Sequence, residues 1–364
     1  ILGVTVAQYS RDNADGRNEL ALVYDNVTRA NNNQVDERLE AIQSTVDGGN
    51  VVAATTVTNI TSNIIQLAST DAEGSSIAAG NISNGLRVWA QVFGQTGEQD
   101  DRDSVDGYDI DTYGFAVGMD TQALADQMLL GLAFSYADSD VDSDNANRTQ
   151  TEIDTYQITL YGTYDLDEAT YISGQLGYAF GDNSTRREDI GGVAAIDADG
   201  DFDSNQFIAR LEAGRAYEVG TITTLTPKLM VNYNYYDADS YRETGAGGAG
   251  LNVDQDTNHI LEIGAGVDAD WMFQQADGSY VKPQVRAGVR YDLADDEIEA
   301  TNRLIGGGNA FKTEGFDPQQ FALDLGAGVT YFSTTNWELT ANYDFEYKED
   351  YNSHAGFLRA AYKF

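Results

Sequence analysis

Apolar and polar residues alternate with a period of two through most of the chain from position 86 to its end, in about twelve segments. In the segment 337–347, one face carries Trp337, Leu339, Ala341, Tyr343, Phe345 and Tyr347. Glutamate, threonine, asparagine and aspartate fill the positions between them. Successive side chains of a β-strand point to opposite faces, so the pattern predicts about twelve strands, each with one apolar and one polar face.

The last of these segments shows the same division and ends on an aromatic residue. Its polar face carries Arg359 and Lys363, and its apolar face carries Leu358, Ala360, Tyr362 and Phe364. A strand of an outer-membrane β-barrel needs both faces, because one meets lipid and the other meets the lumen. The pattern therefore predicts an all-β transmembrane fold, a closed antiparallel barrel of about twelve strands.

The connections between the predicted strands are alternately long and short. The long ones lie near 95–111, 138–151, 182–203, 237–256 and 293–317. The short ones lie near 122–126, 165–168, 218–221, 274–279 and 333–335. Long external loops and short periplasmic turns are typical of outer-membrane barrels, whereas the loops of a soluble β-sandwich would rarely be so uneven. This order predicts a first strand that runs outward from the periplasm and a last strand that returns to it.

Ahead of position 86, apolar residues recur every three or four positions, which predicts helix over much of 17–85. The stretch 51–70 would form a helix about 30 Å long, close to the thickness of a bilayer. Its apolar stripe and its asparagines are Val57, Asn59, Ile60, Asn63, Ile64 and Leu67. A barrel of about twelve strands has a lumen that accommodates roughly one helix, so we expect this segment to thread the lumen.

Composition excludes several classes of function. The chain has 21 Lys+Arg and 59 Asp+Glu, a net charge of -38, so it should repel nucleic acid. It has no cysteine and only two histidines, His259 and His354, which leaves little for a metalloenzyme or a serine triad. It contains no nucleophile elbow and no phosphate loop, and no apolar run of about 18 residues. We expect no catalytic residue, no metal and no other cofactor.

Many charged residues lie on the inward-facing positions of the predicted strands. They are Arg87, Asp120, Arg210, Glu212, Glu262, Asp268, Asp270, Arg286, Arg290, Asp324, Glu338 and Arg359. Such charges are tolerated in a wet lumen, where they form ladders across strands. Two roles are open at this point: ion pairs that act as struts, and contacts with the polar face of the helix.

Motifs within the predicted barrel resemble those of the translocator unit of monomeric, type V secretion autotransporters. They lie at 89–94, 114–120, 130–136, 225–227, 241–246 and 343–364, and the resemblance covers most of 86–364. It implies a twelve-stranded barrel with a helix in the pore and a secreted passenger upstream. On this reading, 1–16 is the end of the passenger, 17–85 is the helical linker and lumen helix, and 86–364 is the barrel.

The resemblance also implies a function and a location. The chain would be the C-terminal part of a longer precursor, a monomer that anchors its own passenger in the outer membrane of a Gram-negative bacterium. Its N-terminus and long acidic loops would be extracellular, and its C-terminus periplasmic. Its partners would be outer-membrane lipid, lipopolysaccharide and the β-barrel assembly machinery, which would read Leu358, Ala360, Tyr362 and Phe364 as an assembly signal. The alternatives are a porin-like diffusion channel and a soluble acidic β-protein that binds surfaces.

Two further sites have an ordinary explanation beside the functional one. Asp140, Asp142 and Asp144 have the spacing of a calcium loop, but the glycine that such a loop needs is absent, and we interpret them as solvated surface. Some autotransporters release their passenger by cyclisation of an asparagine in the lumen helix. Asn59 and Asn63, or the run 31–33, would be the candidates here, and we interpret them as polar helix surface.

Overall fold

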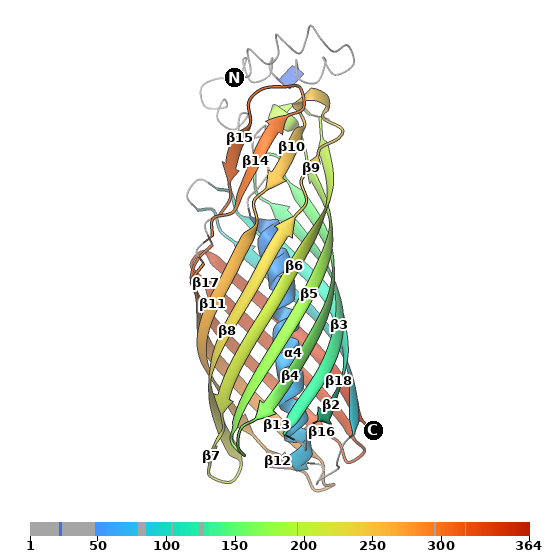
Figure 1. Cartoon of the computed structure of the whole chain (residues 1–364), viewed down its shortest axis with the longest axis vertical. Helices are drawn as coiled ribbons and strands as arrows, with labels where there is room; N and C mark the ends of the chain where they lie inside the picture. The colour runs from blue at the N-terminus through green and yellow to red at the C-terminus, as the bar shows by residue number, and fades with distance from the viewer. Residues whose placement is uncertain are drawn as a thin grey trace.

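The fold is a closed antiparallel β-barrel with one helix inside it (Figure 1). The computed structural model describes residues 22–23, 48–78, 85–102, 105–123, 127–194, 196–294, 296–316 and 318–364. The 12 barrel strands are β1 (Leu86–Gln99), β2 (Tyr108–Ala123), β3 (Met128–Ser143), β4 (Gln150–Asp165), β5 (Thr170–Arg187), β6 (Ala198–Arg215), β8 (Thr223–Ala238), β11 (Asn258–Trp271), β13 (Tyr280–Asp292), β16 (Phe321–Phe332), β17 (Trp337–Lys348) and β18 (Tyr351–Lys363). Each strand pairs with the next, and β18 pairs with β1 to close the barrel. The predicted fold class is confirmed.

The period-two alternation appears in the structure as an apolar outer wall and a polar inner wall. On β17, Trp337, Leu339 and Tyr343 are exposed on the outside, whereas Glu338 and Thr340 are buried. The same alternation of exposed and buried residues runs along β1 and β3 to β6. An outer wall of this kind suits lipid, and closure removes the free strand edges that lipid does not tolerate.

Helix α4 (Gly49–Ala78) runs along the lumen (Figure 1). It includes the predicted stretch 51–70 and extends beyond it at both ends, to a length of about 45 Å. Its Gly49 end lies near the long connections, and the chain end at Phe364 lies at the opposite mouth (Figure 1). In the described part of the chain, no helix combines the length and the apolarity needed to cross a membrane.

Two long connections build a second, four-stranded sheet above one mouth of the barrel (Figure 1). Its strands are β9 (Tyr241–Arg242), β10 (Leu251–Gln255), β14 (Glu299–Leu304) and β15 (Phe311–Glu314), in the order β15-β14-β10-β9. We call it the loop sheet. Leu251, Val253, Ala300 and Leu304 are buried beneath it, in one cluster with Val51 from the start of α4. The short 3-10 helices η1 (Ile190–Gly192) and η2 (Gly247–Ala249) contribute to the same cluster.

The short connections lie at the other mouth, and two of them carry small strands of their own. These are β7 (Tyr217–Val219), which pairs with β8, and β12 (Phe273–Gln274), which pairs with β13. The backbone N–H of Met272 donates to the carbonyl of Ile222, so the two neighbouring turns are linked. The long connections thus lie at one mouth of the barrel and the short connections at the other, as the alternation in the sequence predicted.

The predicted bounds of several long connections were wrong. Strand β3 continues to Ser143 and β4 begins at Gln150, so Asp138, Asp140 and Asp142 are strand residues. The predicted loop 182–203 is likewise strand except for 188–197. The reason is that these strands continue beyond the apolar band, and there the outward face is polar while some inward residues, such as Val141 and Ile153, are apolar. A pattern of apolar and polar residues cannot distinguish such a strand from a loop.

Candidate functional site in the barrel lumen

The alternation of strand residues predicted twelve charged side chains in the lumen. The structure places all twelve on the inner wall. Arg87, Asp120, Arg210, Glu212, Glu262, Arg290, Glu338 and Arg359 are buried there. Asp268, Asp270, Arg286 and Asp324 are partly buried. Ten of them form three groups, of which two contact α4 directly and the third faces it across a cavity, and Asp268 accepts from Lys228 of β8 at 2.8 Å.

The first group lies where β17, β18, β1 and β2 meet, near the Phe364 end. The Arg87 guanidinium donates to both carboxylate oxygens of Asp120, at 3.0 and 2.9 Å, and lies 3.5 Å from Glu338. Arg359 donates to Glu338 at 3.3 Å. Arg87 also donates to the backbone carbonyl of Ala68 on α4. We call Arg87, Asp120, Glu338 and Arg359 the seam network, because β1 and β18 are the first and last barrel strands.

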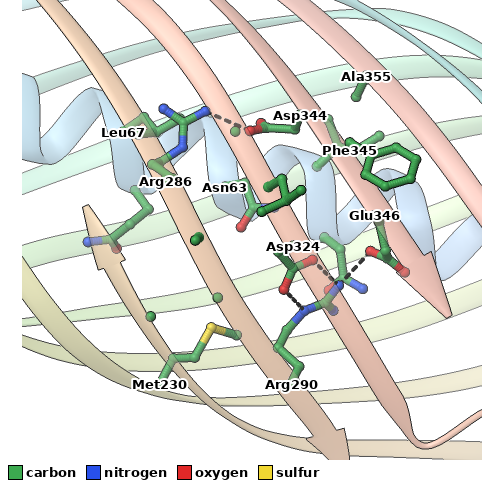
Figure 2. A pocket seen from close by; sticks show the side chains of 18 of the residues that line it. Asn63, Leu67, Met230, Arg286, Arg290, Asp324, Asp344, Phe345, Glu346 and Ala355 are labelled. Carbon is green, nitrogen blue, oxygen red and sulfur yellow. Dashed lines mark hydrogen bonds and ion pairs between the residues drawn. The ribbon is translucent and has the colours of Figure 1, made fainter. Parts of the chain in front are cut away.

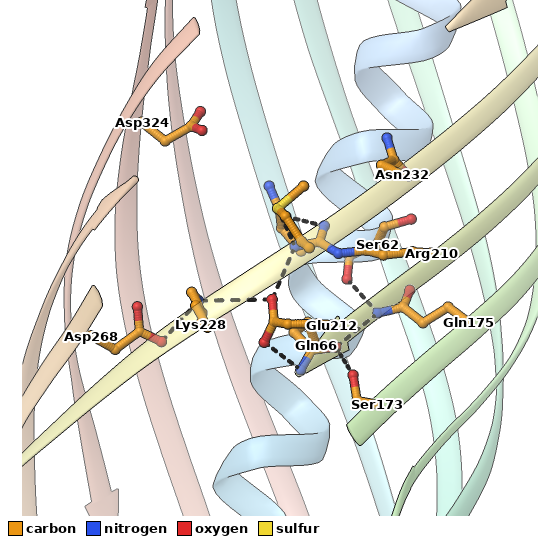
Figure 3. Close-up of polar contacts among 12 residues, drawn as sticks. Ser62, Gln66, Ser173, Gln175, Arg210, Glu212, Lys228, Asn232, Asp268 and Asp324 are labelled. Atoms are coloured by element: carbon orange, nitrogen blue, oxygen red, sulfur yellow. Dashed lines mark hydrogen bonds and ion pairs between the residues drawn. The ribbon is translucent and has the colours of Figure 1, made fainter. Parts of the chain in front are cut away.

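The second group centres on Glu212, whose side chain is almost fully buried (Figure 3). Its carboxylate accepts from Gln66 of α4 at 3.1 Å and from Tyr171 at 2.8 Å. The amide oxygen of Gln66 accepts from Ser173 at 2.5 Å, and Gln175 donates to the carbonyl of Ser62 at 3.0 Å. These contacts attach one turn of the helix to β5 and β6 and fix both its height and its rotation.

The two asparagines of α4 are part of the same wall contacts. Asn63 accepts from Arg210 at 2.6 Å, and Asn59 accepts from Asn232 at 3.0 Å. Asn232 also donates to Glu262 at 3.1 Å. Both asparagines therefore hold the helix to β6 and β8, a role that the interpretation as plain polar surface did not include.

The third group spans four strands on the opposite wall (Figure 2). Arg290 on β13 donates to Glu262 on β11 at 2.7 Å and to Asp324 on β16 at 2.7 Å. It also donates to Glu346 on β17 at 2.5 Å. Arg286 donates to Asp344 at 2.6 Å in the same way. These pairs are struts across the strands, and each carboxylate lies within reach of a cation in a partly dry environment.

A cavity of about 150 Å³ separates this third group from the helix. It follows one face of α4, which carries Thr56, Asn59, Ile60, Asn63, Gln66 and Leu67. Its outer walls are β8, β11, β13 and β16 to β18. A space of this size has room for on the order of ten water molecules. The helix therefore lies off-centre and leaves this cavity along one side.

The other face of α4 is apolar and packs against the wall from β1 to β4. Val57, Ile64, Ile65 and Ala68 share one buried cluster with Trp89 of β1. The Trp89 indole donates to Tyr161 at 2.9 Å, and the Tyr161 hydroxyl donates to Asp120 at 2.7 Å. The other predicted helix residues, Ile60 and Leu67, are buried in the same cluster.

Sequence reasoning missed the neutral members of these networks. Gln66, Ser173 and Gln175 are uncharged, so a search for charges passes over them. Trp89 and Tyr161 are inward-facing aromatic residues, which an apolar-out pattern treats as exceptions. One signal in the sequence could have found them. Trp89, Tyr161, Ser173 and Gln175 all occupy inward-facing positions in the alternation of their strands.

The predicted assembly-signal residues share the outer face of β18. Leu358 and Phe364 are exposed, and Ala360 and Tyr362 are partly exposed. The Tyr362 ring lies 5.1 Å from Trp337 and 4.8 Å from Phe364. The described residues contain no group of acidic or histidine side chains that could hold a metal ion, and Asp142 instead accepts from Gln150 at 2.9 Å.

A family model described as "Autotransporter beta-domain" matches residues 88–344. The chain is 26% identical over 357 residues to "Outer membrane protein A" of Rickettsia conorii, which covers 91% of this chain and 17% of that protein. It is 22% identical over 299 residues to "Outer membrane protein B" of Rickettsia prowazekii, covering 79% of this chain and 18% of that protein. The chain thus spans less than a fifth of the length of these relatives.

Solved structures show the same architecture. The translocator domain of autotransporter NalP from Neisseria meningitidis matches with a TM-score of 0.64 at 18% identity, covering 86% of this chain and 99% of that one. The transport unit of autotransporter AIDA-I from Escherichia coli matches with a TM-score of 0.62 at 16% identity, covering 78% and 91%. The chain belongs to the autotransporter β-domain family, as an outer-membrane translocator barrel with a helix in its lumen.

Proposed function

We propose that this barrel delivers an upstream passenger to the cell surface and then anchors it there. The observation that carries the proposal is the path of the chain. Helix α4 occupies the lumen along its length (Figure 1), and β1 begins beside the chain end, where the Phe364 N–H donates to the Leu86 carbonyl at 3.0 Å. At the other mouth, Gly48 has a φ of +99° and lies against Ile298 and Phe316, beside the loop sheet. A chain that continues upstream from Gly48 would leave the barrel on that side.

The orientation follows from the asymmetry between the two mouths. Outer-membrane barrels place long connections outside the cell and short turns in the periplasm. The loop sheet would then be extracellular, and Phe364 would lie at the periplasmic rim. Residues 1–16 would belong to the passenger, 17–85 to the linker and lumen helix, and 86–364 to the barrel. The long acidic connections would face the medium.

The proposal includes several partners. The apolar outer wall would contact lipid and, in the outer leaflet, lipopolysaccharide. The outer face of β18, with Leu358, Ala360, Tyr362 and Phe364, would be read by the β-barrel assembly machinery. The closed barrel needs no second copy to cover a strand edge, which favours a monomer. The lumen contacts described above are struts and helix contacts, and we assign no catalysis to them.

The porin-like alternative makes a different prediction about ion flow, and planar bilayers test it. The full chain should be mostly closed, because α4 leaves a cavity of only about 150 Å³. Removal of residues 1–80, which takes away the helix, should raise single-channel conductance severalfold. Removal of residues 1–47 alone keeps α4 and serves as the control, which should stay closed. Steady, high conductance in the full chain would support the porin instead.

A further inference from the structure

The inner wall of the barrel has an apolar part, which includes the seam between β1 and β18, and a charged part. Large aromatic side chains point inward from the two seam strands: Trp89 and Phe93 on β1, and Phe357 on β18. Strands β11, β13 and β16, beyond β17, instead carry glycines between their charged inward-facing residues, namely Gly264, Gly266, Gly288, Gly326 and Gly328. Among the described residues, the apolar part of the inner wall runs from the seam strands across β2 to β4, where Ala116, Leu129 and Tyr161 belong to the same cluster.

Helix α4 covers this apolar surface. Ile64, Ile65 and Ala68 share a buried cluster with Trp89 and Phe357, and Ile64 and Ile65 have no exposed surface. The burial of such side chains is the dominant favourable term in packing, so the helix and the seam stabilise each other. Without α4, the aromatic side chains of both seam strands would face water in the lumen.

The ion pairs of the seam network lie at the same part of the wall. Arg87 on β1 reaches Glu338 on β17 by passing over β18, where the residue in register with Glu338 is the small Ala361. Glu338 also accepts from Arg359 on β18, so the seam network connects both sides of the seam. From the helix side, the Ala68 carbonyl accepts a hydrogen bond from Arg87. The four charges balance, which makes their burial tolerable only while all partners are present.

We propose that α4 is an inner fastener of the β1–β18 seam, engaged only when residues 57–68 occupy the lumen. This inference rests on the proposed function: while an upstream segment is still passing through, the seam lacks its apolar cover and the Ala68 carbonyl. When the chain stops with α4 in place, the seam is locked. Arrival of the helix thus couples the end of transport to the final stability of the barrel wall.

Amide hydrogen exchange on the full chain in detergent micelles tests the fastener. The double variant Ile64→Asn, Ile65→Asn removes the apolar contacts and keeps the helix polar face. Exchange at the β1–β18 amides should rise at least about tenfold, while the amides of β11–β13, whose residues lie outside the cluster, stay as in the wild type. Asn63→Ala is the contrast, because its partner Arg210 lies on β6: it should loosen β6–β8 and leave the seam unchanged.

An unchanged seam in the Ile64, Ile65 variant would overturn the inference, and so would an equal rise in every strand pair. If the double variant does not assemble, Ile64→Val should give a smaller rise at β1–β18 and leave β11–β13 unchanged. Surface exposure of an upstream tag is a separate readout. If the tag is exposed but the seam exchanges equally in the variant and the wild type, the role of α4 at the seam is wrong and the translocator function stands. If the tag is not exposed, the proposed translocator function itself is wrong.

Discussion

Arg187 at the end of β5 and Glu243 beside β9 form an ion pair with two hydrogen bonds, at 2.7 and 2.8 Å. Both side chains are about 1% exposed. The second Glu243 oxygen also accepts the backbone N–H of Leu251 at 2.7 Å. The pair therefore ties the loop sheet to the barrel wall, and its desolvation is offset by well-directed bonds.

Loss of one partner should release the loop sheet. Glu243→Gln removes the charged partner of a buried ion pair with Arg187, a loss that costs about 3–5 kcal/mol. We expect rapid protease cleavage within 239–257 and an intact barrel. Glu299→Gln, which breaks an exposed pair with Lys312 in the same sheet, is the control and should change little. Equal protease resistance of both variants would show that the pair does not hold the loops.

The outer face of β18 should matter more for assembly than an equivalent position elsewhere. Leu358 and Val285 both face outward, 61% and 47% exposed, and each lies seven residues from the loop-side end of its strand. An arginine at either position meets a similar lipid penalty of about 2–4 kcal/mol near the midplane. If β18 carries an assembly signal, Leu358→Arg should abolish heat-modifiable barrel and Val285→Arg should only reduce it. Similar losses of assembled barrel in both variants would mean that the cost of an arginine in lipid explains the effect and that β18 carries no special signal.

The carboxyl of Asp106, in the first long connection, should titrate above its usual range. Partial burial raises its pKa, and the nearby Asp101 and Asp144 raise it further. A carboxyl with a raised pKa in the folded state favours folding below its unfolded pKa of about 3.9, and this contribution is lost as pH rises through the folded value. Carbon-detected NMR titration measures the pKa directly. Asp144→Asn should lower it, and an unshifted value would contradict the crowding of these carboxylates.

The barrel itself could be predicted because its pattern is strict. Each strand that crosses the membrane must alternate, so parity alone placed Arg87, Glu338 and Arg359 on the inner wall. The length of 51–70 and the width of the barrel were enough to put a helix inside it. These are consequences of a solvent that penalises every polar group on the outside.

The loop sheet and the rotation of the helix could not be predicted in the same way. The loop sheet depends on pairs far apart in sequence, such as Leu251 with Leu304, in short strands that carry no long alternation. The side of the lumen that α4 occupies depends on Trp89 and Phe357 at one wall and on glycines at the other. Only the strand pairing of the closed barrel shows that these residues face the helix together.

The most direct test of the account is the accessibility of tags on intact cells. One tag is placed at residue 1, a second at Ala146 in the connection between β3 and β4, and a third at Gly278 in a short turn. We expect externally added protease or antibody to reach the first two tags and not the third. Protection of the tag at residue 1 while the Ala146 tag is accessible would keep the upstream chain in the periplasm and contradict delivery through the lumen.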